Sequence, residues 1–348
     1  MNILTKLSQH KKQLLIIFII LILSIAIFAL INRPQTSSPS PSPFSPPVST
    51  TPSYQPFYST QPATNTPPQS EINLPQQVNI YTSPAVTIES VKQFFAPIVI
   101  NLNFTDPPNQ TTINSSPHLI WTNQSAYFDV NLTTSQFSTK PLAKTFFGDS
   151  TVTESQALNL AKNWLLQFQL IQPTTSSETT YLHNSGFELE ESSNNYQGAY
   201  AYRFYFFPEI NQLPIFTAST LKAPIVVDVA SKGYIFQINY QLPTLLYSSY
   251  LNSPEQLKSQ KNNILSSQEI AQAINNNQAT IVSSKTDNGN FAPSVLSITK
   301  VNYQLTKLGY QSNLVNNQLI PIFQLTGQGL VSNNSYVNVT AYLPALTQ

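Results

Sequence analysis

Cysteine is absent from this 348-residue chain, and charged residues are scarce. Without a thiol the chain can form no disulfide, thiolate nucleophile, cysteine-ligated zinc site or iron–sulfur cluster. Asp, Glu, Lys and Arg make up 9% of the residues, and the formal net charge is +1. An average soluble domain has about 25% charged residues. A basic surface for nucleic acid is therefore not expected.

Histidine is also rare, and the sequence offers no recognisable metal or nucleophile motif. The three histidines are His10, His118 and His183. The last two have neither a second histidine nor a carboxylate at metal-ligand spacing, so a surface or half-buried polar role is expected for them. No serine lies in a G-x-S-x-G nucleophile elbow. We expect no enzyme activity, no cofactor and no metal.

The acidic cluster FELEESS is the strongest remaining argument for an enzyme. In a strand, Glu188 and Glu190 share a face, as the paired acids of a glycosidase or the ligands of a divalent cation would. Phe187 and Leu189 would then occupy the opposite face. A solvent-facing side of a sheet explains this alternation more simply, so Glu188 and Glu190 are candidates for a partner contact.

Arg203 lies in the aromatic segment AYAYRFYFF and is the third candidate contact residue. Its side chain would face away from Tyr200 and Phe204 if the segment is a strand. It could stack on Tyr205, pair with a carboxylate such as that of Asp228, or contact a partner. Pairing within the fold is the simplest expectation.

Residues 14–31 form the longest apolar run, LLIIFIILILSIAIFALI. A helix over this run rises about 27 Å, close to the thickness of a bilayer's hydrocarbon core. Lys6, Lys11 and Lys12 precede it and Arg33 follows, which predicts a cytoplasmic N-terminus and an exported remainder. A cleavable signal peptide is the alternative, but it would have a shorter apolar region and a small-x-small cleavage site. We therefore expect a single-pass signal anchor in the cell membrane.

The rest of the chain changes composition at several points, which suggests its domain organisation. A tail of residues 1–13 precedes the anchor, and residues 32–70 are rich in Pro, Ser and Thr, typical of a disordered linker. Short apolar runs such as APIVINLNF and SAYFDVNL predict a β-rich segment over 71–150. Residues 151–248 and 249–348 each predict an α+β repeat with one helix on an antiparallel sheet.

The repeat interpretation depends on a similar order of signals in each half. Thr151 with Glu154 predicts a capping box that opens a helix, and Ser266 with Glu269 predicts a second. Strand-like text follows in both halves, with a hairpin turn expected at Lys232-Gly233 in the first. LPIF at residues 213–216 also has a counterpart in IPIF at 320–323.

These helix-led units, the second of which closes with LIPIFQLTGQG and YVNVTAYLPAL, resemble bacterial extracytoplasmic domains of the PepSY type. They also resemble the related YycH/YycI proteins, membrane-anchored regulators of a sensor histidine kinase. The stretch SSQEIAQAI looks like the helix of that group, and residues 341–345 look like its closing strand. The resemblance implies a non-catalytic exported domain and transfers no catalytic residue.

Three functions therefore remain open from the sequence. The first is a membrane-anchored extracytoplasmic binding or sensory module for an unknown protein or peptide, with strand addition at a sheet edge as one mode of binding. The second is a structural cell-surface or adhesion protein. The third, which the sequence favours least, is an enzyme that acts on envelope polymers through Glu188 and Glu190.

Overall fold

The computed structural model describes 64–68, 74–83, 86–141, 152–184, 189–192, 199–217, 222–253, 257–285, 298–313, 318–332 and 334–346. All of these residues belong to one compact unit, Pro52–Gln348. In this part of the chain the fold is mixed α+β, as predicted, with many strands and four helices. None of the described helices is long and apolar enough to cross a membrane. The predicted anchor at 14–31 and most of the predicted linker lie outside the described residues. The predicted end of the linker at residue 70 is wrong, because Thr64–Thr66 forms a strand that pairs with residues 300–302.

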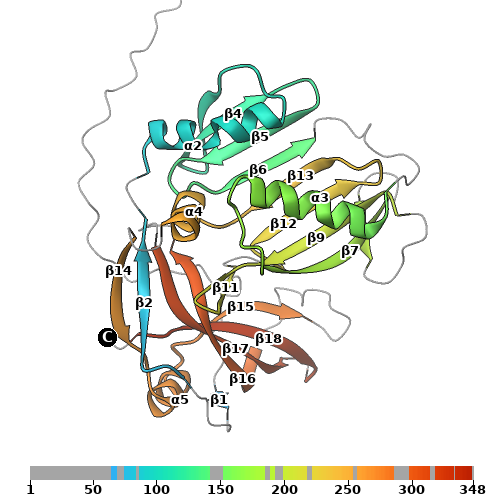
Figure 1. Ribbon diagram of the computed structural model, residues 1–348. Coiled ribbons are helices and arrows are strands. Elements are labelled where there is room, and N and C mark those ends of the chain that lie inside the picture. The colour runs from blue at the N-terminus through green and yellow to red at the C-terminus, as the bar shows by residue number, and fades with distance from the viewer. Residues whose placement is uncertain are drawn as a thin grey trace, which may run out of the picture. The chain divides into compact units, whose positions relative to one another are not determined.

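The first of two sheets has nine described strands in the order β3-β4-β5-β6-β13-β12-β9-β7-β8 (Figure 1). The paired neighbours of this sheet are antiparallel. Its strands are β3 Asn109–Ile113, β4 Ser116–Thr122, β5 Ala126–Asn131, β6 Phe137–Pro141, β7 Ser176–Asn184, β8 Leu189–Ser192, β9 Ala201–Phe207, β12 Ile225–Ala230 and β13 Ile235–Tyr240. Because β6 pairs with β13, part of the predicted segment 71–150 shares one sheet with the predicted first repeat.

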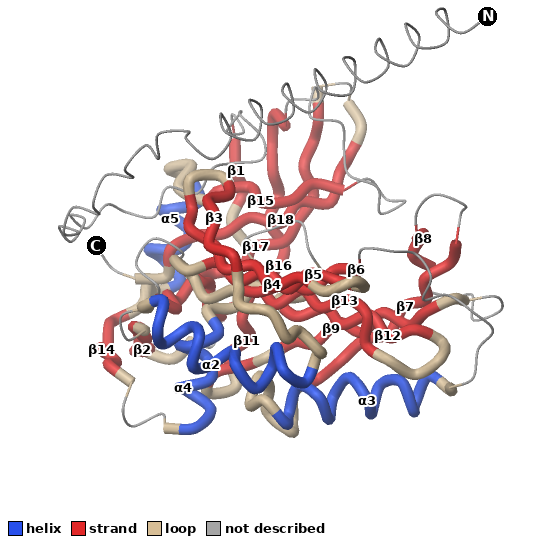
Figure 2. Tube along the Cα trace, turned by 90° about the horizontal axis from the view of Figure 1, so that it is seen from above, coloured by secondary structure: helices blue, strands red, loops and turns tan. Residues whose placement is uncertain are grey.

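Helices α2 (Ile88–Asn101) and α3 (Glu154–Gln167) pack on one face of this sheet and lie on the same side of it in Figure 2. The strand predicted from APIVINLNF is wrong, because most of that text belongs to α2. Val91, Phe95 and Ile98 are buried at helical spacing, and this period includes residues that precede the apolar run. Proline is uncommon inside a helix, so Pro97 disfavoured a helical interpretation of this run.

Helix α3 was predicted correctly, but its first residue was not. Its N-cap is Thr153, whose hydroxyl accepts from the backbone N–H of Gln156 at 3.3 Å, while the Gln156 side chain accepts from the backbone of Thr153 at 2.8 Å. The capping box therefore lies two residues after the predicted Thr151 and Glu154. Glu154 instead accepts a hydrogen bond from the Tyr181 hydroxyl at 2.8 Å.

The second sheet also has nine described strands, six of them in the order β10-β11-β16-β17-β18-β15. Off this path, β1 pairs with β16, β2 pairs with β17, and β14 pairs with β2. Its strands are β1 Thr64–Thr66, β2 Gln77–Thr82, β10 Glu209–Ile210, β11 Leu213–Phe216, β14 Lys258–Asn263, β15 Thr280–Lys285, β16 Ile298–Asn313, β17 Gln318–Val331 and β18 Tyr336–Pro344.

Helix α5 (Ser267–Asn275) packs on one face of the second sheet, and its predicted capping box is confirmed. The Ser266 hydroxyl accepts from the Glu269 N–H at 3.3 Å, and the Glu269 carboxylate accepts from the Ser266 N–H at 2.8 Å. Ile270 and Ile274 of the helix share a core with β16, β17 and β18. Val337, Val339, Ala341 and Leu343 of β18 alternate onto this buried face, which leaves a second face of the sheet.

Helix α4 (Thr244–Asn252) follows the first sheet and contributes to a tyrosine cluster with the second. Tyr250 packs edge-on against Tyr81 of β2, with 5.6 Å between the ring centroids, and Tyr81 lies 5.6 Å from Tyr310 of β16. Asn211 donates to the Tyr81 hydroxyl at 2.7 Å. The apolar core of the first sheet therefore extends to strands of the second.

The predicted hairpin at Lys232-Gly233 is confirmed, since Gly233 has φ +86° and its N–H donates to the Ala230 carbonyl at 2.8 Å. A register shift lies beside this hairpin. Asp228 pairs with Gln237 but the next residue pairs with Ile235, so Phe236 is bulged. Ile235 thus packs toward the core under α3, whereas Phe236 joins a cluster on the other face.

The two sheets do not share one strand order. After α3 the strands run β7-β9-β12-β13 as neighbours, whereas after α5 the first strand, β15, pairs with the last, β18. The LPIF text at 213–216 forms β11, which pairs with the short strand β10 before it and with β16 of the second sheet, and not with β9 or β12 of the first sheet. The tandem repeat at 151–248 and 249–348 stays a prediction that this order does not favour.

Candidate binding site

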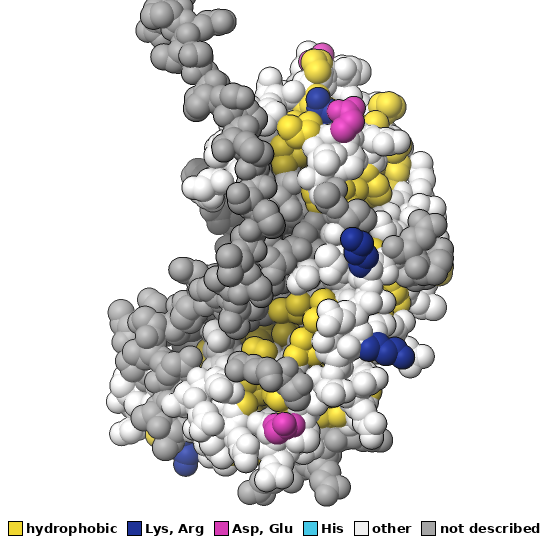
Figure 3. All heavy atoms as spheres, turned by 90° about the vertical axis from the view of Figure 1, so that its left-hand side faces the viewer, with side chains coloured by type: hydrophobic (Ala, Val, Ile, Leu, Met, Phe, Trp, Pro, Cys, Tyr) yellow, Lys and Arg dark blue, Asp and Glu magenta, His cyan; other side chains and the backbone are white. Residues whose placement is uncertain are grey.

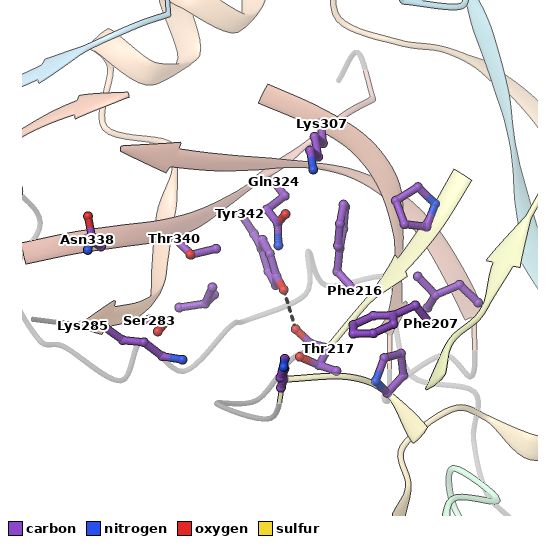
Figure 4. A pocket seen from close by; sticks show the side chains of 15 residues that line it. Phe207, Phe216, Thr217, Ser283, Lys285, Lys307, Gln324, Asn338, Thr340 and Tyr342 are labelled. Carbon is purple, nitrogen blue, oxygen red and sulfur yellow. Dashed lines mark hydrogen bonds between the residues drawn. The ribbon is translucent and has the colours of Figure 1, made fainter. Parts of the chain in front are cut away.

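A cavity of about 440 Å³ lies over the second face of the second sheet (Figure 4). Strands β11, β16, β17, β18 and β15 line it, and residues beside β9 and β12 of the first sheet complete the wall. Its described lining residues are Phe207, Pro214, Ile215, Phe216, Thr217, Lys222, Pro224, Val282, Ser283, Lys285, Lys307, Gln324, Asn338, Thr340 and Tyr342. Its size is in the range of pockets that bind small molecules or short peptide segments.

The strand register sets the positions of the polar side chains in this cavity. Lys307, Gln324 and Tyr342 are direct cross-strand neighbours on β16, β17 and β18. Further along β18, Asn338 pairs with Lys285 of the edge strand β15. Alternate residues of a strand point to the same face, so these side chains form one polar surface opposite the buried core.

Aromatic side chains form the apolar part of the cavity. Phe216 stacks on Tyr342 with 6.0 Å between centroids and 29° between ring planes, and the Tyr342 hydroxyl donates to the Thr217 carbonyl at 2.6 Å (Figure 4). Burial raises the pKa of Tyr342 to about 12, against the effect of hydrogen bonds with Gln324 and Thr217. The hydroxyl therefore remains a neutral donor at physiological pH.

Gly309 gives the Phe216 ring its place against β16. A Cβ at this position would lie 2.5 Å from the Pro214 carbonyl oxygen and would overlap the ring of Phe216. Only glycine leaves room for β11 and its phenylalanine so close to the sheet. The position of the Phe216 ring therefore depends on the absence of a side chain at Gly309.

Three lysines give the cavity positive charge, since none of its described lining residues carries a carboxylate. Lys222 forms an exposed ion pair with Glu178 at 2.6 Å, and its ammonium lies 4.8 Å from the Tyr205 ring centroid. Lys307 is exposed and forms no ion pair with any described residue. With the amides of Gln324 and Asn338, these ammonium groups offer hydrogen-bond donors to an anion.

Arg203 pairs within the fold, as predicted, and is not among the described lining residues of the cavity. Its guanidinium donates twice to Asp228, with both N–O distances 2.8 Å, and the Asp228 side chain is fully buried. It also donates to Glu191 at 3.4 Å. The bidentate pair joins neighbouring positions of β9 and β12.

Glu191 links this ion pair to the cavity wall. It accepts hydrogen bonds from Tyr205, whose hydroxyl lies 2.7 Å from each carboxylate oxygen, and Lys222 lies over the ring of the same tyrosine. Burial raises the pKa of Glu191, but the hydrogen bonds from Tyr205 and Arg203, with the charge of Arg203, lower it overall. Burial and the carboxylate raise the pKa of Tyr205.

The other two predicted contact residues, Glu188 and Glu190, stay predictions. Glu188 lies outside the described residues, and Glu190 lies in β8 opposite His183, with no description of its side chain. Glu191, the third member of the acidic cluster, is the one with described contacts. His118 is half-buried and pairs with Asp129 at 2.7 Å. Within the described ranges, no group of three or more His, Cys, Asp or Glu could hold a metal ion.

Sequence reasoning missed the three lysines of the cavity. They are separated by 63 positions between Lys222 and Lys285 and by 22 between Lys285 and Lys307, and only the sheet topology brings them together. One signal was available, because lysines are few in this chain and Lys307 lies in a strongly alternating strand. The face of the molecule in Figure 3 carries few and scattered charged side chains among the described residues, as expected from a chain with 9% charged residues.

No family model matches the chain, and no curated protein matches its sequence. Among solved structures, an uncharacterized protein from Eubacterium rectale ATCC 33656 is similar at 12% identity over 77% of this chain and 83% of that chain, with a TM-score of 0.39. The C-terminal domain of YpeB from Bacillus megaterium is similar at 10% identity over 76% and 99%, with a TM-score of 0.29. Similarity this weak does not assign the chain to a family.

Proposed function

We propose that this chain is a membrane-anchored extracytoplasmic binding module without catalytic activity, and that its cavity receives an anionic ligand. The observation that carries the proposal is the cavity lined by Lys222, Lys285 and Lys307 beside an aromatic wall. A ligand bound there would meet ammonium and amide donors together with apolar contacts, a combination that is typical of ligand pockets. Residues 14–31 would hold the chain in the membrane, and the Pro/Ser/Thr-rich residues from 32 up to β1 would space the folded part from it.

A relationship to PepSY-type and YycH/YycI-type domains remains part of this proposal. A capped helix that precedes antiparallel strands, as at Ser266, is consistent with it. The difference in strand order between the two sheets argues against two copies of one unit. A role in regulating a membrane or envelope partner would follow from the relationship and not from the cavity.

The proposal is tested by titrating the detergent-solubilised full chain with fluorescent poly-L-glutamate and with inorganic polyphosphate. We expect both to bind, with an affinity that falls as salt rises. The triple variant Lys222→Gln, Lys285→Gln, Lys307→Gln should lose most of this affinity. Lys261→Gln is a control, because Lys261 is exposed on β14 and does not line the cavity.

Two results would overturn the proposal. The first is that neither polyanion binds the native chain. The second is that the triple variant, with an unchanged circular dichroism spectrum, binds both of them as tightly as the native chain does. A structural surface protein would then be the better explanation.

A further inference from the structure

Two of the lysines lie at opposite ends of the cavity. Lys307 and Tyr342 are separated by one intervening strand, and Asn338, four positions before Tyr342, pairs with Lys285 on the next strand. With about 4.8 Å between strands and about 3.3 Å per residue, the Cα atoms of Lys307 and Lys285 are roughly 20 Å apart. In Figure 4 the labelled side chains of Lys307 and Lys285 lie on opposite sides of Tyr342.

This separation excludes one compact anion as the ligand of both lysines. Each ammonium is carried on a flexible four-carbon stem that reaches about 6 Å from its Cα. Even when both stems point inward, roughly 8 Å remains between the two ammonium groups. A ligand that uses both lysines must therefore carry two separate anionic groups.

Aromatic and apolar side chains lie beside the polar groups of Gln324 and Thr340 on the surface between the two lysines. Phe216 and Tyr342 form a stacked pair that packs with Val282 and Ile322. Phe207 lines the same cavity from the first sheet. A ligand that fits this surface has an apolar group between its two anionic groups. Polyphosphates and acidic polysaccharides lack such a group, whereas a peptide with an aromatic or aliphatic side chain has one.

We infer that the cavity binds an extended peptide segment with the pattern Glu-x-Φ-x-Glu, where Φ is apolar and either acid can be Asp. In an extended peptide, alternate side chains share one face, and positions i and i+4 are about 13 Å apart. The outer carboxylates then meet Lys307 and Lys285 while the central side chain lies on Phe216. Gln324 beside Lys307 and Asn338 beside Lys285 can donate to the peptide's carbonyl groups. This inference rests on the proposed function and names the ligand class for its site.

The test uses fluorescein-labelled GESFSEG and its isomer GFSEESG, which has the same composition and charge but adjacent acids. Anisotropy is measured with the full chain in detergent. We expect GESFSEG to bind at least about threefold more tightly than the isomer, and Lys285→Gln or Lys307→Gln each to weaken it about threefold to fivefold. Arginine at either position should retain the affinity, and Lys261→Gln should leave it unchanged. Melting curves of each variant report whether it folds.

The inference is overturned if the two peptides bind equally, or if both folded glutamine variants bind GESFSEG like the native chain. Binding of polyphosphate or poly-L-glutamate without preference for GESFSEG would remove the peptide pattern and leave the proposed function in place. Failure of every anionic probe would remove both.

Discussion

Asp228 is fully buried, and the guanidinium of Arg203 makes two hydrogen bonds to its carboxylate. Arg203→Met would leave this carboxylate buried without its partner charge, which typically costs about 3–5 kcal/mol of unfolding free energy. Replacement of both residues, as Arg203→Met with Asp228→Leu, should recover most of that loss because no unpaired charge remains. Urea denaturation measures both effects. An unfolding free energy of Arg203→Met within about 1 kcal/mol of that of the native chain would contradict the role assigned to the pair.

Glu191 gives the fold a pH dependence through its lowered pKa. A carboxylate whose pKa is lower in the folded state stabilises the fold above its unfolded value of 4.5, and this stabilisation is lost as the pH falls through the folded value. Tyr205→Phe removes a hydrogen bond that lowers the pKa. The variant should therefore be less stable at pH 7, with a difference from the native chain that shrinks below about pH 4.5.

Denaturant melts of the native chain and Tyr205→Phe between pH 3 and pH 7 measure this difference. Tyr127→Phe is a suitable control, since Tyr127 is half-buried on β5 and does not shift the pKa of Glu191 or Asp228. A destabilisation by Tyr205→Phe that is the same at every pH would mean that lost packing, and not the carboxylate, is responsible.

At the scale of elements, β11 is held against β16 by the space above Gly309. Gly309→Ala should push Phe216 and β11 away from the sheet, at a cost of about 1–3 kcal/mol. It should also weaken poly-L-glutamate binding less than the loss of the lysines does, because the charges remain. Thermal melts and titration check both parts. Gly329→Ala, whose Cβ would meet only side chains of the buried face, should destabilise the chain without altering the cavity.

Local signals predicted elements well where the periodicity was unbroken. The capping box at Ser266 and the turn at Gly233 are confirmed. The strand predicted from APIVINLNF failed for a local physical reason, because Pro97 disguised the helical period of α2. A bulge at Phe236 of β13 is a second local feature that the text does not show. Side-chain period alone cannot detect a bulge, because the extra residue is defined by the partner strand.

At the scale of the whole molecule, the α+β class was predictable but the sheet assignments were not. Nothing in the local text indicates that β11 joins β16 or that β6 joins β13. The candidate cavity follows from these non-local pairings, so it could not be found from spacing in the sequence. Arg203 was the one predicted contact residue whose partner, Asp228, was also named correctly.

The absence of cysteine makes the membrane topology directly testable. A single introduced cysteine at Ser8→Cys or Ser267→Cys is the only thiol in its chain. Because the lysines before residue 14 predict a cytoplasmic N-terminus, a membrane-impermeant maleimide on intact cells should label Ser267→Cys and not Ser8→Cys. Lysis should expose both. Labelling of Ser8→Cys alone in intact cells would reverse the predicted orientation.

The pairing of β2 with β14 has a consequence for how this chain acquires its structure. The backbone groups of residues 77–82 cannot pair with β14 until residues 258–263 have been synthesised. Those of β1 cannot pair until β16 has been synthesised. Closure of such long loops slows folding, so a ribosome or translocon would release most of the chain before the second sheet can form. Fragments truncated before residue 298 should therefore remain substrates for proteases, and the slowest refolding phase should report this late closure.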